Sequence, residues 1–138
     1  MIEYRRIPEL ARPVVETMVT RLFVGLQLDR SWRSLRVRTN GRLRDADATI
    51  AVKWELLHAD LDIRPALLLD QAALYAALTH EFVHLATWPF REAIDVAVVH
   101  IADIRRRRNL KRQMLRQYEH VSEDMAQMIE QLLPWNDE

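Results

Sequence analysis

The chain of 138 residues contains no cysteine, only two glycines, and no apolar run long enough to cross a bilayer. The absence of cysteine excludes disulfide bonds and thiolate metal ligands, so nitrogen and oxygen must hold any bound metal. The first residues also lack the apolar core of a signal peptide. We therefore expect a cytoplasmic protein with no membrane partner.

Neither sign of charge is in excess, because 20 Lys and Arg side chains balance 20 Asp and Glu side chains. Hydrophobic residues make up 49% of the chain, which argues against intrinsic disorder. The length suits a single domain, residues 1–138, that buries a core without disulfide or metal staples. These totals do not favour a general polyanion-binding protein.

The most informative segment is His80-Glu81-Phe82-Val83-His84, within a run of good helix formers without Gly or Pro from Gln71 to Trp88. Asp70 stands at the expected N-cap of this helix. Two histidines four residues apart project from one helix face, where both imidazoles can bind one metal ion. The glutamate beside them can hold the water of that metal. The pattern predicts a zinc hydrolase, and a chance motif on a structural helix is the alternative.

A rotation of 100° per residue along this helix separates the two interpretations. Leu74, Leu78 and Leu85 form the predicted buried stripe, with Phe82 beside it. The two histidines and the glutamate occupy one adjoining sector. A chance motif would scatter these polar residues or point all of them at water. The helix is therefore expected to form the wall of a cleft.

The segment before the motif predicts one helix and a small sheet, which makes the fold class α+β. Apolar residues recur at helical spacing from Pro13 to Leu26. Alternation of apolar and polar residues predicts three strands, at 35–38, 49–55 and 60–64. Asn40-Gly41 is typical of a hairpin turn between the first two strands. Pro65 and the alternating charges of the third strand favour a sheet edge.

After the motif, Pro89 breaks the chain, and residues 91–133 predict two helices or one interrupted helix, with Asn109 the expected break. A basic cluster follows the first part of this segment: Arg105, Arg106, Arg107, Arg108, Lys111 and Arg112. Its simpler interpretation is a solvated helix end whose cations complement the helix dipole. A nucleic-acid contact through this cluster is the alternative.

A zinc hydrolase of this kind needs a third protein ligand. The histidine that one large class of zinc proteases places six residues past the motif would fall on Phe90, which excludes that class. The remaining candidates are Glu119, His120 and Glu123 on the last helix, and His100 before it.

A helical wheel of the last helix ranks these candidates. Its predicted buried arc contains Leu110, Met114, Tyr118, Val121, Met125, Met128, Ile129 and Leu132. Glu119 lies at the border of this arc, and His120 lies nearly opposite it. A ligand that reaches a cleft beside the core belongs at the border, so Glu119 is favoured and the others stay open. Tyr118 is expected to be a core residue.

The motif followed by Tyr118-Glu119-His120-Val121-Ser122-Glu123 resembles the gluzincins, zincin metallopeptidases whose third ligand is the Glu of an N-E-x-x-S-D pattern. The chain departs from that pattern at Tyr118 and at Glu123. A helix, a small three-stranded sheet, the motif helix and a glutamate helix, in that order, are similar to minimal single-domain gluzincins and to metallopeptidase-like proteins of phage and prophage genomes. The resemblance implies a zinc ion bound by His80, His84 and Glu119, with Glu123 hydrogen-bonded to a ligating histidine.

The resemblance also implies a zinc metalloendopeptidase in which Glu81 takes a proton from the water that attacks a peptide or protein substrate. A non-catalytic zinc-binding protein of the same fold, with an interaction or regulatory role, is the main alternative. A peptidase that acts on DNA-bound proteins and a wholly structural protein are the others. Without a second domain to form the far wall, the cleft is expected to be shallow or closed by residues 86–115, and closure could leave the isolated protein latent.

Overall fold

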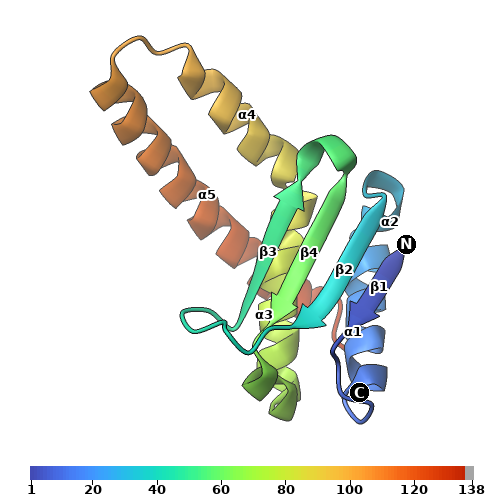
Figure 1. The fold of residues 1–138 in the computed structure, drawn as a ribbon. Helices are drawn as coiled ribbons and strands as arrows, with labels where there is room; N and C mark the ends of the chain where they lie inside the picture. Colours follow the sequence, from blue (N-terminus) through green and yellow to red (C-terminus); the bar gives the residue numbers. More distant parts are fainter. Residues whose placement is uncertain (136–138) are drawn as a thin grey trace.

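The computed structural model describes residues 1–135 and has an α+β fold (Figure 1). Its strands are β1 (Ile2–Arg5), β2 (Ser34–Thr39), β3 (Ala48–Lys53) and β4 (His58–Ile63). Its α-helices are α1 (Arg12–Gly25), α2 (Leu28–Ser31), α3 (Gln71–Ala86), α4 (Trp88–Val99) and α5 (Ile104–Leu132). Two short 3-10 helices, η1 (Trp54–Leu56) and η2 (Pro65–Leu69), follow β3 and β4.

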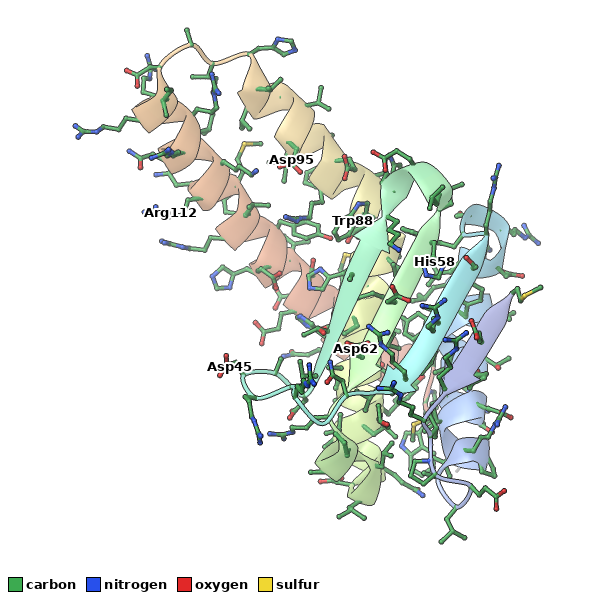
Figure 2. All side chains as sticks on the ribbon, in the orientation of Figure 1. Asp45, His58, Asp62, Trp88, Asp95 and Arg112 are labelled. Carbon is green, nitrogen blue, oxygen red and sulfur yellow. The ribbon has the colours of Figure 1, made fainter. Side chains whose placement is uncertain are left out.

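The four strands form one mixed sheet in the order β1-β2-β4-β3. The pairs β1–β2 and β2–β4 are parallel, and β3 runs antiparallel to β4 at the edge of the sheet. Helices α1 and α3 cover one face, and the opposite face is open (Figure 1). His58 and Asp62 lie on that open face (Figure 2). Strand alternation therefore directs apolar side chains to the helices and charged side chains to water.

The main core lies between the sheet and these two helices. Leu35 and Val37 of β2 and Leu61 of β4 are buried against it, as are Leu78 and Phe82 of α3. Leu74 and Leu85 of α3 are buried as well, so the apolar stripe predicted for the motif helix is confirmed. The motif helix is thus fixed against the largest apolar cluster of the molecule.

The sheet differs from the prediction in two respects. It has four strands, because the short β1 pairs in parallel with β2. The third predicted strand is β4, which lies inside the sheet, so the edge assignment was wrong. The alternating charges of β4 face the open side, where Arg38 Nε donates to Asp62 at 2.6 Å and Arg36 lies 3.6 Å from Asp60. Alternating charges therefore indicate that one face of a strand is solvated, which is true of many inner strands as well as of edge strands.

The predicted hairpin at Asn40-Gly41 is also wrong. The chain does turn there, with the N–H of Leu43 donating to the carbonyl of Asn40 at 3.2 Å. However, β4 lies between β2 and β3, so those two strands do not pair. The hairpin of this sheet joins β3 to β4 through η1, where Leu57 adopts a left-handed backbone with φ of 49°. A local turn signal does not specify which strand becomes the neighbour.

The helices agree better with the sequence. Asp70 caps α3 by accepting a hydrogen bond from the N–H of Ala73 at 3.1 Å, as predicted. Pro89 lies in the first turn of α4, and two helices fill the region after it. The break between them is not at Asn109, which lies inside α5. The break lies between Val99 and Ile104, where Asp103 caps α5 by accepting hydrogen bonds from two backbone N–H groups.

We call residues 1–86 the body and residues 88–132 the helical hairpin. Helices α4 and α5 lie side by side and extend away from the sheet, and the second half of α5 packs on α3 (Figure 1). The end of α5 is tied to the body because the Tyr75 hydroxyl donates to the carbonyl of Leu133. Within residues 1–135, no helix combines the length and apolar character needed to span a bilayer.

Candidate metal centre

The two motif histidines and Glu119 converge on one point between α3 and α5. The Nε2 atoms of His80 and His84 are 3.1 Å apart. One carboxylate oxygen of Glu119 lies 3.3 Å from His84 Nε2, and the other lies 3.7 Å from His80 Nε2. Within residues 1–135, this is the group of His, Asp and Glu side chains whose ligand atoms all lie close enough, within 4.8 Å, to share one metal ion.

These separations fit a tetrahedral zinc site. Zinc binds nitrogen and oxygen at about 2.0–2.1 Å, which places the ligand atoms of a tetrahedron about 3.3–3.4 Å from one another. The Nε2–Nε2 distance of 3.1 Å and the distance of 3.3 Å from His84 Nε2 to one Glu119 oxygen lie close to that value, and the distance of 3.7 Å joins His80 Nε2 to the other oxygen of the same carboxylate. Two imidazoles and a carboxylate also supply the donor set of a catalytic zinc site, which keeps a fourth position open.

A chain of hydrogen bonds is compatible with a proton on Nδ1 of His84. The hydroxyl of Thr87 donates to the carbonyl of Val83 at 2.7 Å, which leaves its oxygen able to accept from the Tyr118 hydroxyl, also at 2.7 Å; the Tyr118 hydroxyl also lies 3.5 Å from the carbonyl of His84. The Tyr118 oxygen can then accept from His84 Nδ1, 3.3 Å away. With the proton on Nδ1, the lone pair of Nε2 points at the metal position.

Burial lowers the pKa of His84 by disfavouring the charged imidazolium, although the Glu119 carboxylate opposes this effect. The His84 side chain is buried where α3 meets the Tyr118 ring. A low pKa keeps the imidazole neutral at physiological pH, and the neutral ring is the form that binds a metal.

Glu81 lies in the same cavity as the two histidines. Burial and the nearby Glu119 carboxylate raise the pKa of Glu81 to about 7 in the metal-free protein, while a hydrogen bond from the backbone N–H of Ile50 lowers it. A carboxylate with a pKa near neutrality can both accept and return a proton at physiological pH. A bound cation would lower this pKa again.

The cavity has a volume of about 500 Å³ and opens between the edge strand β3 and the helical hairpin. Ala48, Thr49 and Ile50 form its β3 wall. Trp88, Arg91, Leu115 and Tyr118 form its opposite wall. Residues 86–115 therefore line the cavity through Trp88, Arg91 and Leu115, and the expectation that they close it stays a prediction.

Arg91 brings a positive charge to this cavity. Its guanidinium lies over the Trp88 ring, 5.1 Å from the ring centroid. Its Nε is buried and has no hydrogen-bond partner among residues 1–135. A cation held by an aromatic ring, with an unused donor beside the metal ligands, is well placed to receive an anionic group.

The structure brings only one of the four candidate third ligands to the histidines. Glu119 reaches them, whereas His100, His120 and Glu123 are exposed and make no hydrogen bond to either histidine within the described residues. Glu123, expected to orient a ligating histidine, is therefore not in that place. The Tyr118 hydroxyl is the group that lies beside the Nδ1 atom of His84, although the sequence indicated only a core residue at this position.

The wheel used for the last helix was partly wrong. The side chains of α5 that are buried are Tyr118, Ser122 and Ala126. Val121 and Met128, placed in the predicted arc, are 57% and 60% exposed. Glu119 borders the observed arc as well, because it lies one residue past Tyr118 on the side of Ala126.

Ser34, His58 and Asp60 make contacts in the order of a Ser-His-Asp triad on the open face of the sheet. Ser34 Oγ lies 2.6 Å from His58 Nδ1, and His58 Nε2 lies 3.1 Å from Asp60. Ser34 and His58 are cross-strand partners in β2 and β4, and the metal-site cavity does not include them. We assign these contacts to the stability of the sheet face.

Comparison with known proteins adds no family to this geometry: no family model, curated protein or solved structure matches the chain.

Proposed function

We propose that this chain is a zinc-dependent metallopeptidase. One observation carries the proposal: His80, His84 and Glu119 converge at ligand spacing in a cavity that also holds Glu81. A structural metal site would saturate the ion with four protein ligands, whereas three ligands beside a glutamate are the arrangement of a hydrolytic site. The runner-up is a zinc-binding protein of the same fold without catalytic activity.

Each side chain has a role in the proposed reaction. His80 and His84 would hold zinc through their Nε2 atoms, and Glu119 would complete the site. Bound zinc supplies Lewis acidity and lowers the pKa of a water molecule toward neutrality. Glu81 accepts the proton of the attacking water and passes it to the leaving amine. Arg91 offers positive charge to the carbonyl oxygen as negative charge develops on it.

The edge strand supports a peptide substrate. Strand β3 pairs with β4 on one side only, so its other edge presents backbone N–H and C=O groups that no strand pairs with, and the N–H of Ile50 is directed to Glu81. The same strand forms one wall of the metal cavity through Ala48, Thr49 and Ile50. An extended peptide that pairs with this edge would run past the metal ligands. The sequence analysis expected the third predicted strand, which is β4, to be the edge strand, and we propose that β3 pairs with the substrate instead.

The test compares Glu81→Gln with the wild type, each loaded with one equivalent of zinc, on a library of quenched fluorescent peptides and an unfolded protein. Glu81→Gln should keep zinc affinity and lose about 10²–10⁴ in rate, because an amide cannot accept the proton. Glu55→Gln, which changes an exposed glutamate on η1, is the matched control and should cleave normally. Equal rates for both variants would exclude Glu81 as the base. Tight zinc binding without cleavage of any substrate would favour the non-catalytic alternative.

A further inference from the structure

The charge of this neutral chain is strongly segregated. Residues 96–117 contain seven Lys and Arg side chains and one acidic side chain, so they carry a formal charge of +6 and the rest of the chain carries −6. This segment is the tip of the helical hairpin, which extends away from the sheet (Figure 1). The compensating negative charge is not in the body, since residues 1–86 carry a formal charge of +1, but in residues 118–138, which contain six acidic side chains and no Lys or Arg.

The basic cluster does not stabilise its own helix. Arg105, Arg106 and Arg107 lie in the first turn of α5 and Arg108 directly follows it, so these charges are at the end where cations oppose the helix dipole, contrary to the helix-end interpretation made from the sequence. Each cation at this end costs about 0.3–1 kcal/mol, and like charges three and four residues apart repel one another. Arg107 is the exception, because its guanidinium donates to the carbonyl of Ile101 and closes the loop before α5.

The other arginines of the arm have no partner. Lys111 pairs with Asp95 at 3.0 Å between α5 and α4. Five exposed arginines make no ion pair or side-chain hydrogen bond among residues 1–135: Arg105, Arg106, Arg108, Arg112 and Arg116. Four of them, at 105, 108, 112 and 116, follow the spacing of one helix face. We call these four residues the arginine stripe. Arg112 of the stripe lies on the side of α5 away from α4 (Figure 2).

We propose that the arginine stripe binds the phosphate backbone of duplex DNA. The stripe spans about 17 Å along α5, which is about half a turn of B-DNA. Arg is the side chain best suited to phosphate, because its planar fork donates two parallel hydrogen bonds. Six of the seven cations of the arm are arginines.

The composition of the arm favours a duplex over other polyanions. Proteins that bind single strands stack bases on aromatic side chains, and residues 91–117 contain no Phe, Tyr or Trp. A helix that lies on a membrane places Trp, Phe or Leu beside its cations. The stripe is arginine alone: on α5 the exposed Ile104 begins the helix and the exposed Leu110 lies on the opposite side from the stripe, while the exposed Val96 and Val99 belong to α4. The phosphates of a duplex backbone, contacted without any contact to the bases, are therefore the ligand that the stripe fits best.

The stripe leads to the metal centre. Glu119 follows Arg116 by three residues and so continues the same face of α5. If DNA binds along the stripe, the metal-site cavity would lie close to any protein that is bound to the adjacent base pairs. This consequence depends on the proposed peptidase, whereas DNA binding by the stripe does not.

Fluorescence anisotropy of a labelled 20-base-pair duplex tests the stripe, with the full chain measured over a salt series. We expect micromolar binding at low salt and a log–log salt slope of about −3 to −4. Arg108→Gln/Arg112→Gln should reduce the slope by about 2 and weaken binding about tenfold. The control Arg30→Gln/Arg33→Gln removes the same charge from exposed positions around α2 and should leave binding within about twofold.

Three results would overturn the proposal. Equal losses for the two double variants would show that only net charge matters. Tighter binding to a single strand than to the duplex would point to base stacking. Binding to vesicles with 30% anionic lipid but not to DNA would make the arm a membrane contact. The stripe variant should also unfold at the same or a higher temperature than the wild type, because it removes like charges that repel one another three and four residues apart on α5. That comparison separates a lost contact from a damaged fold.

Discussion

His80 and His84 belong to the body, where 19 buried apolar residues form one cluster, whereas Glu119 belongs to the helical hairpin, whose own cluster has three: Ile94, Val98 and Tyr118. Two of the proposed ligands are therefore fixed by a large core, and the third depends on how α5 docks against α3. A metal ion bound by all three would join the regions, and its binding energy would add to the stability of the docked state. The metal centre is thus proposed to work as a clamp as well as a reactive site.

The largest expected difference between the regions is in stability. Leu78→Ala in α3 removes a fully buried side chain from the main cluster and should cost about 3–5 kcal/mol of unfolding free energy. Ile94→Ala in α4 should cost about 2–3 kcal/mol, because the smaller cluster around it can relax more easily. Urea denaturation of both variants measures this. A cost at Ile94 that equals or exceeds that at Leu78 would remove the distinction between the regions.

Arg91 tests the hairpin wall of the cavity. Arg91→Met should lower kcat by about 10²-fold if the guanidinium stabilises negative charge in the transition state. Zinc affinity should not change, because the side chain holds no ligand. Arg91→Lys keeps the positive charge but lacks the planar guanidinium, so its kcat should lie between those of the wild type and Arg91→Met. Steady-state kinetics of the three proteins decide this, and an effect confined to KM would assign Arg91 to ground-state binding instead.

Two tyrosines, one in each region, separate ligand orientation from general packing. Tyr118→Phe removes the acceptor that holds the proton on His84 Nδ1 and should weaken zinc binding about tenfold. Tyr75→Phe removes the bond to the carbonyl of Leu133 and should leave zinc affinity unchanged. Competition titration with a chelator gives both affinities, and ¹⁵N NMR of the imidazoles reports the tautomer. If Tyr118→Phe and Tyr75→Phe bind zinc equally well and leave the His84 tautomer unchanged, Tyr118 does not orient this ligand.

The smallest expected effect is on pH dependence. Burial and Glu119 raise the pKa of Glu81 to about 7, above its ordinary value of 4.5. The folded metal-free protein then binds more protons than the unfolded chain between these values, so its stability falls as pH rises through that range. Glu81→Gln mimics the protonated side chain and should raise the unfolding free energy by about 1–2 kcal/mol at pH 8.

The same variant should change nothing at pH 4, where Glu81 is protonated in both states, and urea denaturation at the two pH values checks this. Since the Glu119 carboxylate contributes to the raised pKa, Glu119→Gln in the hairpin should shrink the difference. A gain of equal size at both pH values would mean that burial of the charge is not its cause.

The sequence predicted the body and the hairpin with unequal success, for physical reasons. The motif helix was predictable with its cap and buried stripe, because Asp70 and the spacing of Leu74, Leu78 and Leu85 are local signals. The strand order was not. Insertion of β4 between β2 and β3 is a long-range choice, and neither a turn at Asn40 nor the charges of β4 specify it.

The site shows the same division. The two histidines and the glutamate of the motif follow from spacing on one helix, and Glu119 followed from its position beside a buried arc. The role of Tyr118 could not be predicted, because it requires Thr87, at the junction of α3 and α4, to direct the tyrosine hydroxyl. Arg91 was missed because a single arginine after a proline has no signal until the chain places it over Trp88.

Zinc content and zinc affinity of the purified chain test the metal centre most directly. We expect one zinc per chain, loss of binding in His80→Ala/His84→Ala, and a large loss in Glu119→Ala, since each ligand supplies a substantial share of the coordination energy. His120→Ala, one residue along α5 and exposed, should bind as the wild type does. Full occupancy in the double histidine variant, or a greater loss for His120→Ala than for Glu119→Ala, would contradict the assignment of the site.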